Sequence, residues 1–171
     1  MAVAHIDRPQ RRFALRFAVF GVLLFGLYTF PYEEYGLSET WFTAYLAGYA
    51  RMAGGALSLF EPEIRVSGQD ILGRFGLRIV KSCDAMEAVL LFAAAVLAFP
   101  AAWRTRVLGI ALGIGVLVGL NVVRICTLYY VGVYQPAQFE FYHMEVWPLA
   151  LVSAAGLAFI VWSSWVTRQH G

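Results

Sequence analysis

Long apolar stretches constrain this chain more than any other feature of its sequence. A helix needs about 20 apolar residues to cross the roughly 30 Å of hydrocarbon in a bilayer. Four stretches reach or approach that length, and they cover residues 13–30, 84–100, 107–130 and 146–166. The sequence therefore predicts an all-α integral membrane protein with about four transmembrane helices. We expect a single membrane-embedded domain over residues 1–171.

The composition agrees with this class and excludes others. Hydrophobic residues make up 60% of the chain and charged residues 14%, whereas soluble domains have about 45–50% and 25%. A net charge of +2 is too small to imply a nucleic-acid partner. The two cysteines are too few for a disulfide-dense scaffold or for a four-thiolate zinc site. We expect neither a metal nor a cofactor.

Residues 31–82, between the first two stretches, are predicted to lie outside the cytoplasm. Residues 41–60 include Arg51 and carry their apolar residues on one helical face, which favours an interfacial or re-entrant helix over a span. Residues 63–80 alternate in polarity and contain turn signals, which predicts a small β-hairpin.

The arginines near the ends of the spans predict the orientation. They form three groups, which are Arg8, Arg11, Arg12 and Arg16, then Arg104 and Arg106, then Arg168. Four spans put all three groups on one side of the membrane, and the positive-inside rule assigns that side to the cytoplasm. Both termini are therefore expected in the cytoplasm, in the inner (plasma) membrane of a cell.

Three chemically active side chains come from separate stretches but are predicted at one depth. Cys83 opens the second span, Arg124 lies in the outer part of the third, and His143 precedes the fourth. Under the four-span topology all three meet at the extracytoplasmic surface. Polar groups at this depth are costly, so each one suggests a function.

This set of side chains suits acyl transfer through a thioester. A thiolate is the nucleophilic form of cysteine, and the helix N-terminus expected at Cys83 would favour it. His143 can take a proton from the thiol or give one to a leaving amine, and Arg124 can bind an oxyanion. Supporting roles are expected for three neighbours, namely Asp84, Glu87 and Asn121.

Each of these residues also has a simpler interpretation. Cys83 alone could be packing filler, Arg124 could extend to the interface or cap a helix, and His143 could belong to an interfacial aromatic belt. Cys126 is expected to be buried filler, but a disulfide between Cys83 and Cys126 would make the chain a membrane thiol–disulfide protein. A further alternative is a non-catalytic membrane assembly subunit with structural ion pairs.

The chain resembles the exosortase/archaeosortase family of membrane cysteine transpeptidases. The resemblance lies in residues 82–88, which begin with Ser82-Cys83-Asp84, in residues 121–125, and in the Phe141-Tyr142-His143 element. Many members have Ser-Gly after the cysteine, where this chain has Asp84-Ala85. Together with the small size, this looks most like the compact exosortase H type.

The resemblance implies a cysteine protease or transpeptidase that acts in protein sorting. Its partners would be membrane-anchored proteins with a C-terminal sorting signal, made of a short motif of the Ile-Pro-Thr-Leu type, a transmembrane helix and a basic end. Cys83 would be the nucleophile, Arg124 the stabiliser and His143 the acid and base. The acyl group would pass to a surface lipid or glycan acceptor. We further expect the hairpin to hold the extended motif by strand addition.

Overall fold

The computed structural model describes residues 8–30 and 39–169 of the chain, and these form two compact units. The helical unit contains α1 (Arg8–Thr29), α3 (Met86–Ala98) and the parts of α4 and α6 that lie before Gly115 and after Val152. The sheet unit contains the remaining elements. Two long helices, α4 (Trp103–Tyr134) and α6 (Trp147–Gln169), contribute to both units. A single domain over residues 1–171 stays a prediction.

The predicted fold class is confirmed. Three helices are long and apolar enough to cross a membrane, judged by length and composition, and they are Arg8–Thr29, Trp103–Tyr134 and Pro136–Arg168. They contain three of the four predicted spans, and a small sheet accompanies them. α2 (Glu39–Ser58), which the sequence predicts to be interfacial or re-entrant, is helical and is not one of these three. Residues 31–38 of the predicted external segment lie outside the described residues.

The second predicted span is shorter than the sequence suggests. The sequence predicts residues 84–100, but α3 covers 13 residues, which extend about 20 Å at 1.5 Å per residue. The helix starts late because Ala85 has a φ of 56°, outside the α-helical region. It ends before Pro100, which disfavours helical geometry in the residue that precedes it. α3 is therefore a short apolar helix that lacks the length of a simple span.

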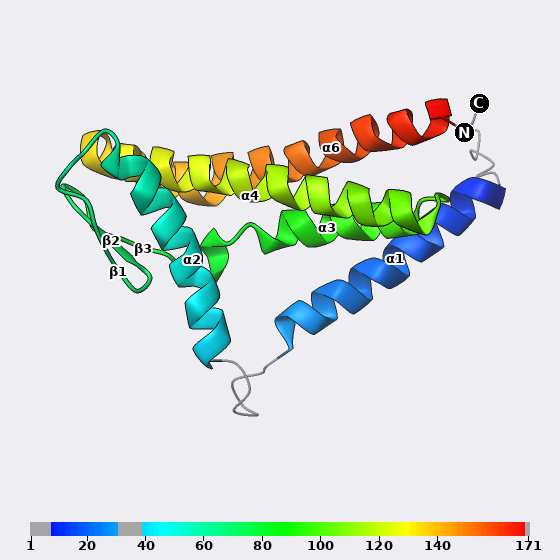
Figure 1. Cartoon of the computed structure of the whole chain (residues 1–171), viewed down its shortest axis with the longest axis horizontal. Coiled ribbons are helices and arrows are strands. Elements are labelled where there is room, and N and C mark those ends of the chain that lie inside the picture. Colours follow the sequence, from blue (N-terminus) through cyan, green and yellow to red (C-terminus); the bar gives the residue numbers. More distant parts are fainter. Residues whose placement is uncertain (1–7, 31–38, 170–171) are drawn as a thin grey trace. The chain divides into compact units, whose positions relative to one another are not determined.

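Close packing of α3, α4 and α6 organises the helical unit, where the three helices run side by side (Figure 1). Eight of the α3 residues are buried, including Phe92. A Cβ atom on Gly113 would overlap the ring of Phe92, and one on Gly109 would overlap the indole of Trp162. Glycine at these two positions of α4 lets α3 and α6 approach its backbone, as in other membrane helix pairs.

α2, the sheet and the C-terminal part of α4 enclose the core of the sheet unit. The apolar residues of α2 recur at helical spacing and face this core, which contains Leu46, Tyr49, Ala50, Ala53, Leu57, Ile71, Leu77, Ile79, Cys83, Ile125 and Tyr129. α2 lies next to the strands (Figure 1), and a Cβ atom on Gly54 would overlap Val66. The nucleophile candidate Cys83 is thus part of a packed core.

The predicted hairpin is present and carries a third strand. β1 (Arg65–Ser67), β2 (Asp70–Leu72) and β3 (Leu77–Arg78) form an antiparallel sheet in the order β1-β2-β3. Gly68 begins the two-residue turn between β1 and β2 with a φ of 58°, a value that favours glycine. Arg78 donates two hydrogen bonds of 2.7 and 2.8 Å to the Asp70 carboxylate across β2 and β3.

The packing of α4 predicts a strong difference between two neighbouring glycines. Gly113→Ile should destabilise the protein by about 1–3 kcal/mol, because the new side chain overlaps Phe92. Gly115→Ile is the matched control, since a Cβ atom there meets nothing within 4 Å. Thermal unfolding in detergent should show a lower midpoint for Gly113→Ile only. Equal midpoints for the two variants would contradict the packing described here.

Candidate active site

Cys83 lies in a short link between the sheet and α3, and this link is not α-helical. It is the last residue of the 3-10 turn η2 (Lys81–Cys83), and its N–H donates to the Val80 carbonyl at 2.8 Å. The expectation that Cys83 occupies a helix N-terminus is therefore wrong, because α3 begins three residues later, at Met86. The first N–H of α3 belongs to Met86, and it donates to Asp84 Oδ1 at 2.9 Å.

His143 lies in a π-helical turn, η4 (Tyr142–Val146), within a helical stretch that starts at Pro136. The sequence predicted His143 ahead of the last span, but the 33-residue helical stretch Pro136–Arg168 already includes it. π turns place one extra residue in a helical turn and are frequent at functional sites. The imidazole stacks on the ring of Phe139 with centroids 5.7 Å apart.

The structure brings the sulfur and the imidazole together. Cys83 Sγ lies 3.5 Å from His143 Nε2, across 60 positions of sequence. A neutral imidazole with its proton on Nδ1 can accept the thiol proton at Nε2. The two side chains thus have the arrangement that an activated cysteine nucleophile requires.

Arg124 connects the segments that carry these two residues. Its Nη2 atom donates to the Ser82 carbonyl at 3.3 Å and to the His143 carbonyl at 3.5 Å. Only 3% of Arg124 is exposed, so it does not extend to the interface as the simpler interpretation assumed. The guanidinium brings a positive charge to both the turn of Cys83 and the turn of His143.

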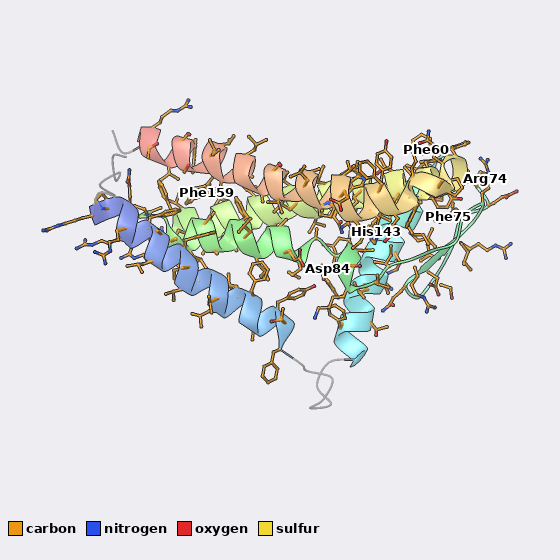
Figure 2. The ribbon with its side chains drawn as sticks, turned by 180° about the vertical axis from the view of Figure 1, so that it is seen from behind. Phe60, Arg74, Phe75, Asp84, His143 and Phe159 are labelled. Carbon is orange, nitrogen blue, oxygen red and sulfur yellow. The ribbon has the colours of Figure 1, made fainter. Side chains whose placement is uncertain are left out.

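Asn121 and Asp84 are buried polar residues close to Cys83. Asp84 and His143 are labelled in Figure 2. Asn121 is fully buried on α4, and its Nδ2 donates to the Cys83 carbonyl at 2.8 Å. Tyr49 of α2 joins them, although the sequence analysis did not select it. Burial raises the pKa of Tyr49, the Asp84 charge raises that pKa further, and hydrogen bonds with Tyr45 and Asn121 lower it. The apolar spacing of α2 was the one signal that could have placed Tyr49 on a buried face.

A pocket of about 240 Å³ opens on the sulfur and the imidazole. Its wall is the chain segment 75–80, which includes β3, and its lining also includes Ile125, Leu128 and Phe139. Every lining residue belongs to the sheet unit. The pocket therefore combines a reactive pair with a strand and an apolar surface.

The model of the transmembrane exosortase family matches residues 10–162. The chain belongs to this family. The match confirms the predicted resemblance, and exosortases are in general membrane transpeptidases. No curated protein and no solved structure matches the chain.

The loop that forms one wall of the exosortase pocket is anchored to α4. Tyr129 is fully buried, and its hydroxyl donates to Glu61 Oε2 at 3.0 Å and accepts from the Arg74 N–H at 3.0 Å. The Arg74 guanidinium lies over the Tyr134 ring. A Cβ atom on Gly132 would overlap the Phe75 ring, and Figure 2 shows Arg74 and Phe75 next to one another.

Two residues considered from sequence lie apart from this exosortase site. Glu87 belongs to the other compact unit, where it is exposed in the first turn of α3. Cys126 is a free thiol that contacts the Ala53 carbonyl at 3.7 Å, while Cys83 is a free thiol that contacts His143. The two sulfurs thus have different partners, which argues against the disulfide interpretation. No group of three potential metal ligands occurs among the described residues.

The contact between Cys83 and His143 predicts a reactive thiol that depends on the imidazole. In a Cys126→Ser background, His143→Phe should slow alkylation of Cys83 by iodoacetamide at neutral pH by about tenfold or more, because the proton acceptor is lost. Mass spectrometry of the purified protein would measure the rate. His5→Phe is the control for loss of a histidine. An unchanged rate in His143→Phe would show that the pair is not coupled.

Proposed function

We propose that this exosortase is a membrane-embedded cysteine transpeptidase that cleaves C-terminal sorting tails through a thioester on Cys83. The observation that carries the proposal is the 3.5 Å contact between Cys83 Sγ and His143 Nε2. Arg124 bridges the turns of both residues, and the pair opens on a pocket. Family membership supports the general class, and this geometry supports the roles of the individual residues.

The reaction proceeds in two acyl transfers. His143 Nε2 takes the Cys83 proton while the sulfur attacks the scissile carbonyl, and an oxyanion forms. Collapse of this intermediate breaks the C–N bond, and the imidazolium gives its proton to the leaving amine. An amine or hydroxyl of the acceptor then attacks the thioester and loses its proton to His143. Collapse of this second intermediate breaks the C–S bond, and the imidazolium returns its proton to the Cys83 thiolate.

Arg124 and Asn121 hold the nucleophile and stabilise developing charge. Asn121 fixes the Cys83 carbonyl, and Arg124 fixes the neighbouring Ser82 carbonyl. Because Arg124 is buried, its positive charge acts with little screening by water on the thiolate and the oxyanion. Arg124 is therefore the proposed stabiliser, and Asn121 and Asp84 are positioning residues. The supporting role expected for Glu87 stays a prediction, because this residue is exposed and belongs to the other unit.

The substrate is proposed to reach the site within the bilayer. A protein that carries its own transmembrane tail diffuses laterally, so a site at the membrane surface meets the peptide bond next to that tail. With α3 counted as a crossing segment despite its 13 residues, the arginine distribution supports an extracytoplasmic site with both termini in the cytoplasm. A tail of the Ile-Pro-Thr-Leu type and a lipid or glycan acceptor are the proposed partners.

The catalytic proposal predicts a clear order among variants of one membrane protein. Cys83→Ala and Cys83→Ser should abolish cleavage of a secreted reporter that carries such a tail. His143→Ala should lower the rate by about 10²–10⁴-fold through loss of acid–base catalysis. Arg124→Ala should lower it by about 10²–10³-fold through loss of charge stabilisation. Immunoblots of precursor and product over time would measure the rates.

Cys126→Ser is the matched control for these variants, because its thiol donates to the Ala53 carbonyl in α2, whereas Cys83 contacts His143. It should process the reporter at the wild-type rate. Processing that survives Cys83→Ala would end the transpeptidase proposal. Variants that disappear from the membrane fraction, rather than remain there inactive, would favour an assembly subunit.

The wall of the pocket suggests how the tail motif binds. β3 is an edge strand of the described sheet, and Ile79 N, directly after β3, donates to Gln69 O, directly before β2, at 3.0 Å. Since alternate residues of a strand point their backbone groups to opposite sides, the N–H and C=O of Arg78 face away from β2. We propose that the extended motif pairs with this edge, which leads its scissile carbonyl to Cys83 in the same pocket.

This binding mode predicts a backbone effect at Arg78 that its side chain does not explain. Arg78→Pro removes an N–H that the sheet does not use, so reporter cleavage should fall by about tenfold or more. Arg78→Ala loses the same ion pair with Asp70 but keeps the N–H, and should stay near the wild-type rate. Both variants should keep the wild-type alkylation rate at Cys83. Equal cleavage by the two variants would refute strand addition and leave the result for Cys83 unaffected.

A further inference from the structure

A second pocket lies in the helical unit, between α1, the turn after α3, the start of α4 and the end of α6. Its volume is about 510 Å³, within the range of about 300–1,000 Å³ that small-molecule sites occupy. Arg16 of α1, Arg106 of α4 and Thr167 of α6 line it, together with the turn that follows α3. None of these residues takes part in the proposed transpeptidase reaction.

The charge in this pocket is positive, and no acidic side chain of the described residues lines it. The Nε atom of Arg106 is buried and has no hydrogen-bond partner among the described residues. The described part of the helical unit contains one acidic residue, Glu87, at the start of α3, whereas the pocket follows the end of that helix. A buried N–H donor without a partner is costly, so an anion that accepts from the Arg106 Nε–H would stabilise this arrangement.

The rest of the lining is mostly apolar. Phe99 and Val166 contribute to it, and the Phe99 ring packs edge to face against Trp162 and Phe159, the latter labelled in Figure 2. The Thr167 hydroxyl donates to the carbonyls of Ser163 and Ser164, so its proton is already used. The pocket thus combines guanidinium donors with an apolar surface, as a phosphate group attached to acyl chains requires.

We propose that this pocket binds the phosphate headgroup of an anionic phospholipid. Arg106 donates to the phosphate oxygens, Arg16 adds charge from α1, and the acyl chains lie against Phe99 and Val166. The bound lipid links α1 to α4 and α6 within the helical unit. This site is independent of the transpeptidase proposal, because it shares no residue with the pocket at Cys83.

The experiment compares thermal unfolding of the full chain in nanodiscs of phosphatidylcholine and of phosphatidylcholine mixed with phosphatidylglycerol. The wild type should unfold at a higher temperature when phosphatidylglycerol is present. Arg106→Gln and Arg16→Gln should each lower the affinity for phosphatidylglycerol by about fivefold, as loss of one arginine contact predicts. Arg104→Gln is the matched control, since it removes the same charge from an exposed position outside the lining.

The outcomes separate a lipid from other sources of anionic charge. An equal loss in Arg104→Gln and Arg106→Gln would indicate general attraction to an anionic surface and overturn the proposal. Stabilisation by inorganic phosphate in phosphatidylcholine nanodiscs, to the same extent as by phosphatidylglycerol, would overturn the lipid assignment. If Arg106→Gln fails to fold, Arg16→Gln on a different helix still tests the pocket. Wild-type affinity of Arg16→Gln for phosphatidylglycerol would then overturn the proposed lipid site.

Discussion

The candidate active site depends on how a buried, non-helical link satisfies its backbone carbonyls. Carbonyls of a link outside α-helical hydrogen bonding need donors from elsewhere in the protein. In this exosortase, Asn121 binds the Cys83 carbonyl and Arg124 binds the Ser82 carbonyl. Both side chains come from one face of α4, three positions apart. The same hydrogen bonds that satisfy these two carbonyls therefore also fix the position of the Cys83 sulfur.

The histidine side of the site obeys the same constraint in a different way. The π turn at residues 142–146 interrupts the usual helical bonding, and Arg124 donates to the His143 carbonyl within it. One guanidinium thus holds backbone from both reactive segments, and the imidazole also stacks on Phe139. This arrangement explains why a buried arginine is useful here in place of a lysine. Its planar fork can serve several acceptors from one fixed position.

The sequence predicted that Cys83, Arg124 and His143 would meet, because four spans would place them at one depth. In the structure Cys83 contacts His143, and Arg124 donates to a carbonyl in each of their segments. The sequence did not predict the local geometry. Hydropathy detects apolar length, so the late start of α3 was missed, since it depends on the Asp84 side chain and on the φ of Ala85. The role of Tyr49 depends on the packing of α2 against residues distant in sequence. Such features arise from tertiary contacts that no single segment encodes.

The departure from the family pattern after the cysteine has a structural explanation. Ala85 has a φ of 56°, in the left-handed region that glycine adopts freely. Alanine there costs about 1–2 kcal/mol, so the Gly found in many members at this place suits the same backbone. Asp84 caps Met86 N, which a serine hydroxyl at that position can also do. The Asp-Ala pair is therefore compatible with the turn that Ser-Gly would form between the cysteine and α3.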